Sequence, residues 1–113
     1  MKSKFHVRWS LSAERDLHSI IEHISKDSIT NAKKILQRIR HEAETLNTFP
    51  ENGRVVPEYE IQSLFIFREL IVPPWRIIYS FSGKHVNLLA VIDSRQNLED
   101  FILRRIMRKL EDG

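Results

Sequence analysis

The hydrophobic pattern at the start of the chain predicts one short strand and a first helix. Apolar and polar residues alternate over Phe5–Trp9, which is the period of a strand that buries one face. Ser10 and Ser12 then supply oxygens that can cap a helix. The apolar residues of this helix recur at the spacing of a single buried stripe: Leu17, Ile20, Ile21 and Ile24. We expect the helix to end near residues 25–28.

A second and longer helix follows after a short polar break. The segment Asp27–Thr30 supplies new capping oxygens, and helical spacing continues as far as Phe49, where Pro50 and Gly53 stop it. Its apolar positions are Ala32, Ile35, Leu36, Ile39, Ala43 and Leu46. Because the break is so short, the two helices must form a hairpin, and their buried stripes need a further layer to cover them.

Three runs rich in β-branched and aromatic residues predict that further layer. After a loop to about Gln62, the runs span Leu64–Val72, Trp75–Phe81 and Val86–Ile92. The breaks between the runs are short and contain proline or glycine. Connections of this kind favour an antiparallel meander.

A polar segment follows the last run, and Asn97 can cap a final helix. Glu99 and Asp100 in its first turn, and arginines and a lysine later, complement the helix macrodipole. Its apolar positions are Leu98, Phe101, Ile102, Ile106 and Leu110. The predicted order is therefore β-α-α-β-β-β-α. We expect one α+β domain over 1–113, with a helix hairpin packed on a small, curved, mainly antiparallel sheet and a C-terminal helix.

Composition narrows the class of protein. A chain of 113 residues that is 42% hydrophobic can bury one modest core. It contains no cysteine, which excludes disulfides and thiolate metal sites and fits the cytoplasm. The pattern shows no signal peptide and no membrane span, so we expect a soluble protein. The formal charge of +3 leans toward anionic partners but does not choose among them.

Five local motifs, in order along the chain, resemble the ParE/RelE toxin superfamily of type II toxin–antitoxin systems. They are Ala13, Asp16, Leu17 and Ile20; Leu46, Phe49, Pro50, Gly53 and Arg54; Arg68-Glu69-Leu70; Trp75-Arg76-Ile77-Ile78-Tyr79; and Val91-Ile92-Asp93-Ser94-Arg95-Gln96. Each motif alone is weak, but five at the family spacing over nearly the whole chain are specific. The resemblance is closer to ParE. It implies a toxin that inhibits DNA gyrase, arrests growth, stabilises plasmids and is neutralised by a cognate antitoxin protein in a hetero-oligomer.

The main alternative is a RelE-like endoribonuclease that cuts messenger RNA on the ribosome. By that resemblance its catalytic residues would be Arg76, Tyr79, Asp93 and Arg95. Asp93, however, stands where many members have histidine, and a carboxyl with a pKa of about 3.9 is a poor proton donor near neutral pH. Gln96 also replaces a second arginine of the family. We therefore favour the gyrase inhibitor, which is not an enzyme; a non-toxic binding module of the same fold is a third interpretation.

Four arginines are the candidate partner-binding residues: Arg54, Arg68, Arg76 and Arg95. If the sheet brings the last three together, they form a cationic concave patch that could hold an acidic antitoxin segment. For Arg68 and Arg76 an ordinary ion pair across strands is an equally good interpretation, and for Arg54 a structural role at the helix end is the better one. Arg95 has the strongest claim because it lies in a polar loop. We expect the antitoxin to add an amphipathic helix or a strand.

No metal or cofactor is expected. The five histidines lack the spacing of a metal site, since His18 and His23 are five residues apart rather than four. The basic face of the second helix is interrupted by Glu42 and Glu44, which is typical of a solvated surface.

Overall fold

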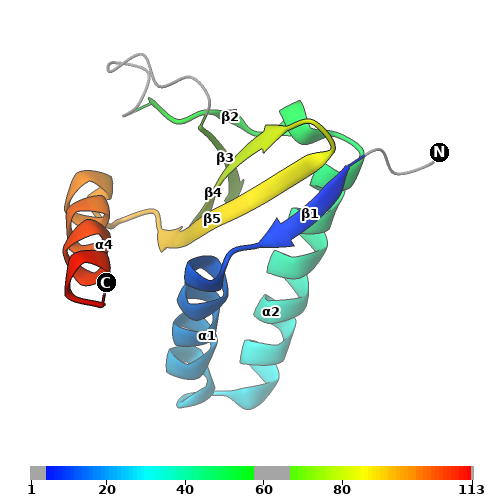
Figure 1. The fold of residues 1–113 in the computed structure, drawn as a ribbon. Helices are drawn as coiled ribbons and strands as arrows, with labels where there is room; N and C mark the ends of the chain where they lie inside the picture. The colour runs from blue at the N-terminus through cyan, green and yellow to red at the C-terminus, as the bar shows by residue number, and fades with distance from the viewer. Residues whose placement is uncertain (1–4, 58–66, 113) are drawn as a thin grey trace.

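The chain folds as an α+β structure in which a helix hairpin covers one face of a five-stranded sheet (Figure 1). The structure is a computed structural model that describes residues 5–57 and 67–112, without the side chains of residues 102, 106 and 108–112. The helices are α1 (Leu11–Ser25), α2 (Ile29–Glu44) and α4 (Leu98–Asp112). The fold class predicted from the sequence is confirmed.

Serine side chains begin both helices of the hairpin, as the sequence indicates. The Ser10 hydroxyl accepts a hydrogen bond from the Ala13 amide at 3.0 Å, and the Ser28 hydroxyl accepts one from the Asn31 amide at 3.0 Å. Asn97 caps α4 in the same way, since its side-chain oxygen accepts from the Asp100 amide at 3.1 Å.

The second helix ends earlier than predicted. Two 3₁₀ turns, η1 (Thr45–Asn47) and η2 (Pro50–Asn52), replace its expected continuation to Phe49. The Thr45 hydroxyl donates to the Glu42 carbonyl at 2.6 Å, a local bond that favours a tightened turn over a further α-helical one. The tighter turns bring the chain back toward the sheet.

The sheet has the strand order β1-β5-β4-β3-β2. All neighbours are antiparallel except β1 and β5, which are parallel. The strands are β1 (His6–Trp9), β2 (Arg54–Val55), β3 (Arg68–Val72), β4 (Trp75–Ser82) and β5 (His85–Asp93). β2 corrects the sequence prediction, which placed a loop there, because two residues are too few for an alternating pattern to show. The predicted strand start at 64–66 and the loop end near Gln62 lie outside the described residues.

The core fills both faces of the sheet, and a bulge in β5 divides its residues between them. Ile78 pairs with Ala90 but Tyr79 pairs with Leu88, so Leu89 is an extra residue in β5. Leu88 therefore faces the helix hairpin while Ala90 faces the opposite side. The cluster on the hairpin side is the larger of the two and includes Leu17, Ile39, Ala43, Leu46, Leu70, Trp75, Ile77 and Tyr79.

One buried hydroxyl fastens the end of the hairpin to the sheet. Tyr79 is 0% exposed, and its hydroxyl donates to the Pro50 carbonyl at 2.6 Å and accepts from the Gly53 amide at 2.8 Å. A Cβ at Gly53 would lie 2.5 Å from the Glu69 carbonyl oxygen and 2.5 Å from the Tyr79 hydroxyl. Only glycine fits there, because the backbone passes directly against the tyrosine. The core position predicted for Tyr79 is confirmed.

We predict that Gly53→Ala lowers the free energy of unfolding by about 3 kcal/mol, the upper part of the range for overpacking, because backbone and tyrosine must both move. Urea unfolding of both proteins measures the difference. Gly83→Ala is the matched control: a Cβ there meets no atom within 4 Å and only the φ of 57° is unfavourable. The control should lose about 1 kcal/mol. An equal loss in both variants would contradict the close contact at Gly53.

Candidate functional site

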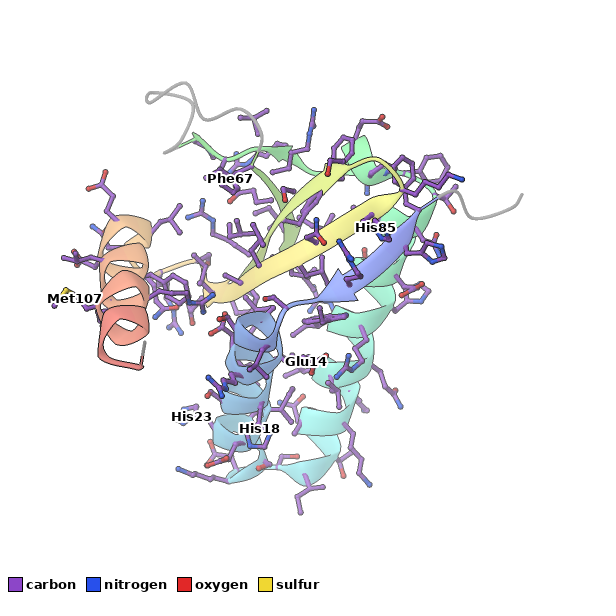
Figure 2. All side chains as sticks on the ribbon, in the orientation of Figure 1. Glu14, His18, His23, Phe67, His85 and Met107 are labelled. Atoms are coloured by element: carbon purple, nitrogen blue, oxygen red, sulfur yellow. The ribbon has the colours of Figure 1, made fainter. Side chains whose placement is uncertain are left out.

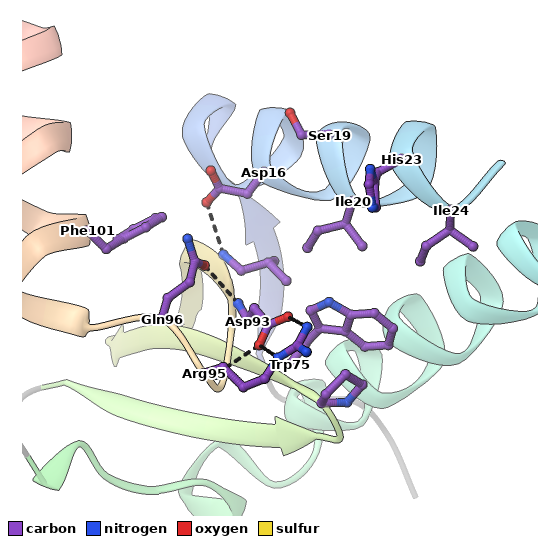
Figure 3. Close-up of a pocket in the computed structure, with 12 residues that line it drawn as sticks. Asp16, Ser19, Ile20, His23, Ile24, Trp75, Asp93, Arg95, Gln96 and Phe101 are labelled. Carbon is purple, nitrogen blue, oxygen red and sulfur yellow. Dashed lines mark hydrogen bonds and ion pairs between the residues drawn. The ribbon is translucent and has the colours of Figure 1, made fainter. Parts of the chain in front are cut away.

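A cleft of about 640 Å³ lies between α1, the end of β5 and the start of α4 (Figure 3). Elements far apart in the sequence line it: Asp16, Ser19, Ile20, His23 and Ile24 from α1; Pro74 and Trp75 at the start of β4; Val91 and Asp93 from β5; Arg95 and Gln96 from the loop after it; and Phe101 from α4. Its floor is apolar and its rim is polar. A cleft of this kind suits the apolar face of an amphipathic segment.

The far wall of the cleft is held by an ion pair between α4 and α1. Arg105 Nη2 lies 2.6 Å from both carboxylate oxygens of Asp16, and Arg105 Nη1 donates to the Leu89 carbonyl at 2.8 Å. The same carboxylate accepts the Val91 amide at 3.0 Å. Asp16 thus joins α1, β5 and α4. The bulge makes this possible, because the extra residue turns a β5 carbonyl toward α4.

Arg105 is a site residue that the sequence pattern did not predict, because it is one of several basic residues late in the last helix. A signal was present, because Asp16 is a charged residue next to Leu17 on a helix whose buried residues are Ala13 and Leu17. A carboxylate in that position needs a partner. Leu103 and Met107 of α4, unlike Arg105, are exposed, and Met107 points away from the sheet (Figure 2).

Asp93 and Arg95 form a close ion pair at the rim of the cleft. Arg95 Nη2 lies 2.7 Å from Asp93 Oδ2, and Arg95 Nε and the Arg95 amide donate to Oδ1 at 3.0 and 2.8 Å. These bonds from Arg95 lower the pKa of Asp93 to about 2, and the carboxylate in turn raises the pKa of Arg95. Arg95 is therefore exposed but held in place by Asp93.

Arg54 and Arg76 share one buried carboxylate on the face of the sheet that the hairpin leaves open. The Glu69 side chain is 0% exposed; Arg54 Nε lies 2.6 Å from Oε1, and Arg76 Nε lies 2.6 Å from Oε2. The cross-strand ion pair predicted for Arg76 is present, and its acid is Glu69. Arg54 pairs with Glu69 too, so its structural contact is in the sheet. Both arginines border a shallow hollow that also includes Pro57, Ile71 and Ser94.

Arg68 lies on the other face. Its Nη1 donates to the Gly53 carbonyl at 2.8 Å, and its guanidinium lies 5.8 Å from the centre of the Phe81 ring. It pairs with Tyr79 in the sheet, whereas Arg76 pairs with Ile71. Residues 68 and 71 are an odd number of positions apart, so their partners point to opposite faces.

The prediction that Arg68, Arg76 and Arg95 could form one cationic patch is therefore wrong. Arg68 and Arg76 are on opposite faces, and Arg95 lies at the rim of the cleft. The structure instead brings together Arg54 with Arg76, and Asp93 with Arg95. Whether any of these arginines binds a partner remains a prediction.

The four residues of the ribonuclease alternative do not converge either. Tyr79 lies in the hairpin-side core, where burial raises the pKa of its hydroxyl and both of its hydrogen bonds go to the backbone. Arg76 is buried against Glu69 on the opposite face. Asp93 and Arg95 pair with each other at the cleft. No single phosphate could contact all four side chains.

The described part of the chain contains neither a cluster of metal-ligating side chains nor a helix that could span a membrane. No group of three or more histidine or acidic side chains there is close enough to hold a metal ion. His18 and His23 lie on α1, well away from His85 beside β1 (Figure 2). Within the same residues, none of the helices combines the length and the apolar character needed to cross a membrane.

Comparisons with known proteins agree with this geometry. A family model described as the ParE toxin of the type II toxin–antitoxin system parDE matches residues 7–98. Among solved structures, a chain of the chromosomal ParDE toxin–antitoxin system from P. aeruginosa superposes with a TM-score of 0.67 and 20% sequence identity, covering 80% of this chain and 96% of that one. No curated protein sequence matches. The matched segment runs from the second residue of β1 to the first residue of α4, which is most of the chain, so the chain belongs to the ParE toxin family of type II toxin–antitoxin systems.

Proposed function

We propose that this ParE-family toxin acts in the cytoplasm by binding and inhibiting DNA gyrase, and that it has no ribonuclease activity. The observation that carries the proposal is the dispersal of the residues a ribonuclease would need. Cleavage of RNA by general acid–base catalysis requires a proton donor and a cation within reach of one phosphate. Here the tyrosine, the aspartate and the buried arginine each have a structural partner in a different place.

Proton transfer is the step this chain is least able to perform. With its pKa lowered to about 2 by Arg95, the Asp93 carboxyl is ionised at pH 7 and has no proton to donate. The Tyr79 hydroxyl is fully buried and already hydrogen-bonded. An inhibitor that works by binding needs neither group as an acid, because it needs only a surface that fits its target.

The cleft is the part of this surface best suited to the antitoxin. Its floor of Ile20, Ile24, Trp75, Val91 and Phe101 offers apolar contacts to an amphipathic helix. Ser19, His23 and Gln96 at the rim offer polar ones. The similar solved structure is that of a ParDE toxin–antitoxin system. We infer that a cognate antitoxin segment orders on binding here and blocks the toxin.

Two assays on the purified chain, run side by side, test the target. We expect inhibition of supercoiling by purified gyrase, and no new ends in messenger RNA bound to purified ribosomes. In cells that lack the antitoxin, we expect growth arrest with filamentation and DNA-damage signalling. Ribosome-dependent cleavage of messenger RNA without inhibition of gyrase would overturn the proposal.

We predict that Arg95→Ala reduces toxicity sharply while leaving the free energy of unfolding nearly unchanged, because its side chain is 84% exposed. Loss of the guanidinium also raises the pKa of Asp93 from about 2 toward its ordinary value, which carboxyl NMR titration measures. A lowered pKa stabilises the fold above the unfolded pKa. The variant loses this contribution, which solvent screening keeps small at so exposed a pair, and its stability depends less on pH between about 4 and 2. Arg38→Ala, at an exposed position on α2, is the control and should keep full toxicity.

We predict that Asp93→His confers no cleavage of ribosome-bound messenger RNA, although it places an imidazole where many superfamily members have one. The reason is geometric, since Tyr79 and Arg76 remain buried on opposite faces of the sheet. Primer extension on ribosome-bound message measures cleavage, and Asp93→Asn controls for loss of the charge. Cleavage by the unmodified chain that disappears in Asp93→Asn would make Asp93 a catalytic residue and contradict the proposed mechanism.

A further inference from the structure

Two histidines lie opposite one another on the face of the sheet that the helix hairpin leaves open. His6 of β1 is the register partner of His85 of β5, so their side chains leave neighbouring strands at the same level. The ring centres are 5.8 Å apart, and the ring planes are inclined by 35°. The expectation of no metal rested on spacing along the chain, which cannot reveal a pair made by two distant strands.

Neither imidazole is engaged elsewhere within the residues that the structure describes. No hydrogen bond or ion pair there involves either ring, and Nδ1 of the half-buried His85 is itself buried without a partner. His18 differs, since its Nε2 lies 3.1 Å from the Glu22 carboxylate. An unpaired buried nitrogen in a native fold calls for an explanation, and a bound ion is one.

The separation of the two rings fits a single metal ion between them. Imidazole nitrogen binds zinc at about 2.0–2.1 Å, so two rings on one ion have centres at most about 6.4 Å apart, counting about 1.1 Å from each nitrogen to its ring centre. The observed 5.8 Å lies inside this limit. His85 is held between β1 and β4, whereas His6 is exposed on an edge strand and can turn its ring. Rotation of side chains is therefore enough to form the site.

The surroundings of the pair decide which ions suit it. The described residues supply no third histidine or carboxylate at this place, so water completes the coordination and the ion exchanges with solvent. Arg8 follows on the same face, but its Nε and Nη2 donate to Asn87 Oδ1 at 3.1 and 2.8 Å, which holds the guanidinium in the next row. Two imidazoles suit Ni²⁺, Cu²⁺ and Zn²⁺, whereas Mg²⁺ and Ca²⁺ require oxygen ligands.

We propose that His6 and His85 together bind one late first-row divalent metal ion across the β1–β5 pair. The ion joins the short N-terminal edge strand to its neighbour. Because the two imidazoles meet only when these strands are in register, binding favours the folded chain. The inference concerns a ligand of the sheet and is independent of gyrase as the target.

Calorimetric titration of the untagged chain with NiCl₂ or ZnCl₂ tests the proposal. We expect one saturable ion per chain, and no binding of MgCl₂. His6→Phe and His85→Phe each keep a ring in the contact but remove its nitrogen ligands, so each should weaken binding of Ni²⁺ at least tenfold. His18→Ala is the matched control on α1 and should leave the affinity unchanged. Zn²⁺ should raise the Tm of the unmodified chain and not that of His6→Phe.

A spectroscopic measurement locates the ion. In NMR spectra of the unmodified chain, substoichiometric Cu²⁺ should broaden the amide signals of β1 and of the start of β5 before any others. Three results would overturn the inference: no saturable binding of Ni²⁺ or Zn²⁺, affinity that both phenylalanine variants retain, or broadening centred on His18 and His23. The second result would leave the pair as an aromatic contact between strands. If a phenylalanine variant fails to fold, the broadening in the unmodified chain still decides the question.

Discussion

The carboxylate of Asp16 is the contact on which the arrangement of this toxin depends. It belongs to α1, accepts the Val91 amide of β5 and pairs with Arg105 of α4, so three elements distant in sequence meet at one side chain. Its side chain is 13% exposed, and at such a site loss of one partner leaves a buried charge uncompensated. Together with the packing of Leu98 and Phe101 in the core, this pair holds α4 beside the cleft.

Buried charge organises the other face of the sheet as well. Glu69 is enclosed between Arg54 and Arg76, and removing a carboxylate from water is costly unless its oxygens are hydrogen-bonded. Arg76 is therefore a buried structural residue, whereas the Arg54 side chain remains 63% exposed and is accessible to a partner. The arginines of the family motifs thus divide into those that support the sheet and those that a partner could reach.

Hydrophobic period and capping residues were sufficient to predict most of this fold. The serine caps, the hairpin and the long strands leave signals that extend over many residues, and the structure confirms them. β2 and the 3₁₀ turns were missed because each spans only two or three residues. The site was harder to predict, since the grouping of arginines depends on which face of the sheet each one occupies. That parity is set by the register of β3 and β4, and neither charge nor spacing along one strand reveals it.

The bulge at Leu89 determines which face of the sheet each later residue of β5 occupies. Before it, Leu88 faces the hairpin; after it, Val91 does, and Asp93 pairs with Trp75 on the same side. If these same residues paired in regular alternation, with Leu89 opposite a residue of its own, every side chain beyond Leu89 would point the other way. Val91 and Asp93 would leave the cleft, and Ala90 and Ile92 would take their places. A shift of the pairing by a single residue here would therefore exchange the lining of the cleft for that of the opposite face, although not one side chain had been altered.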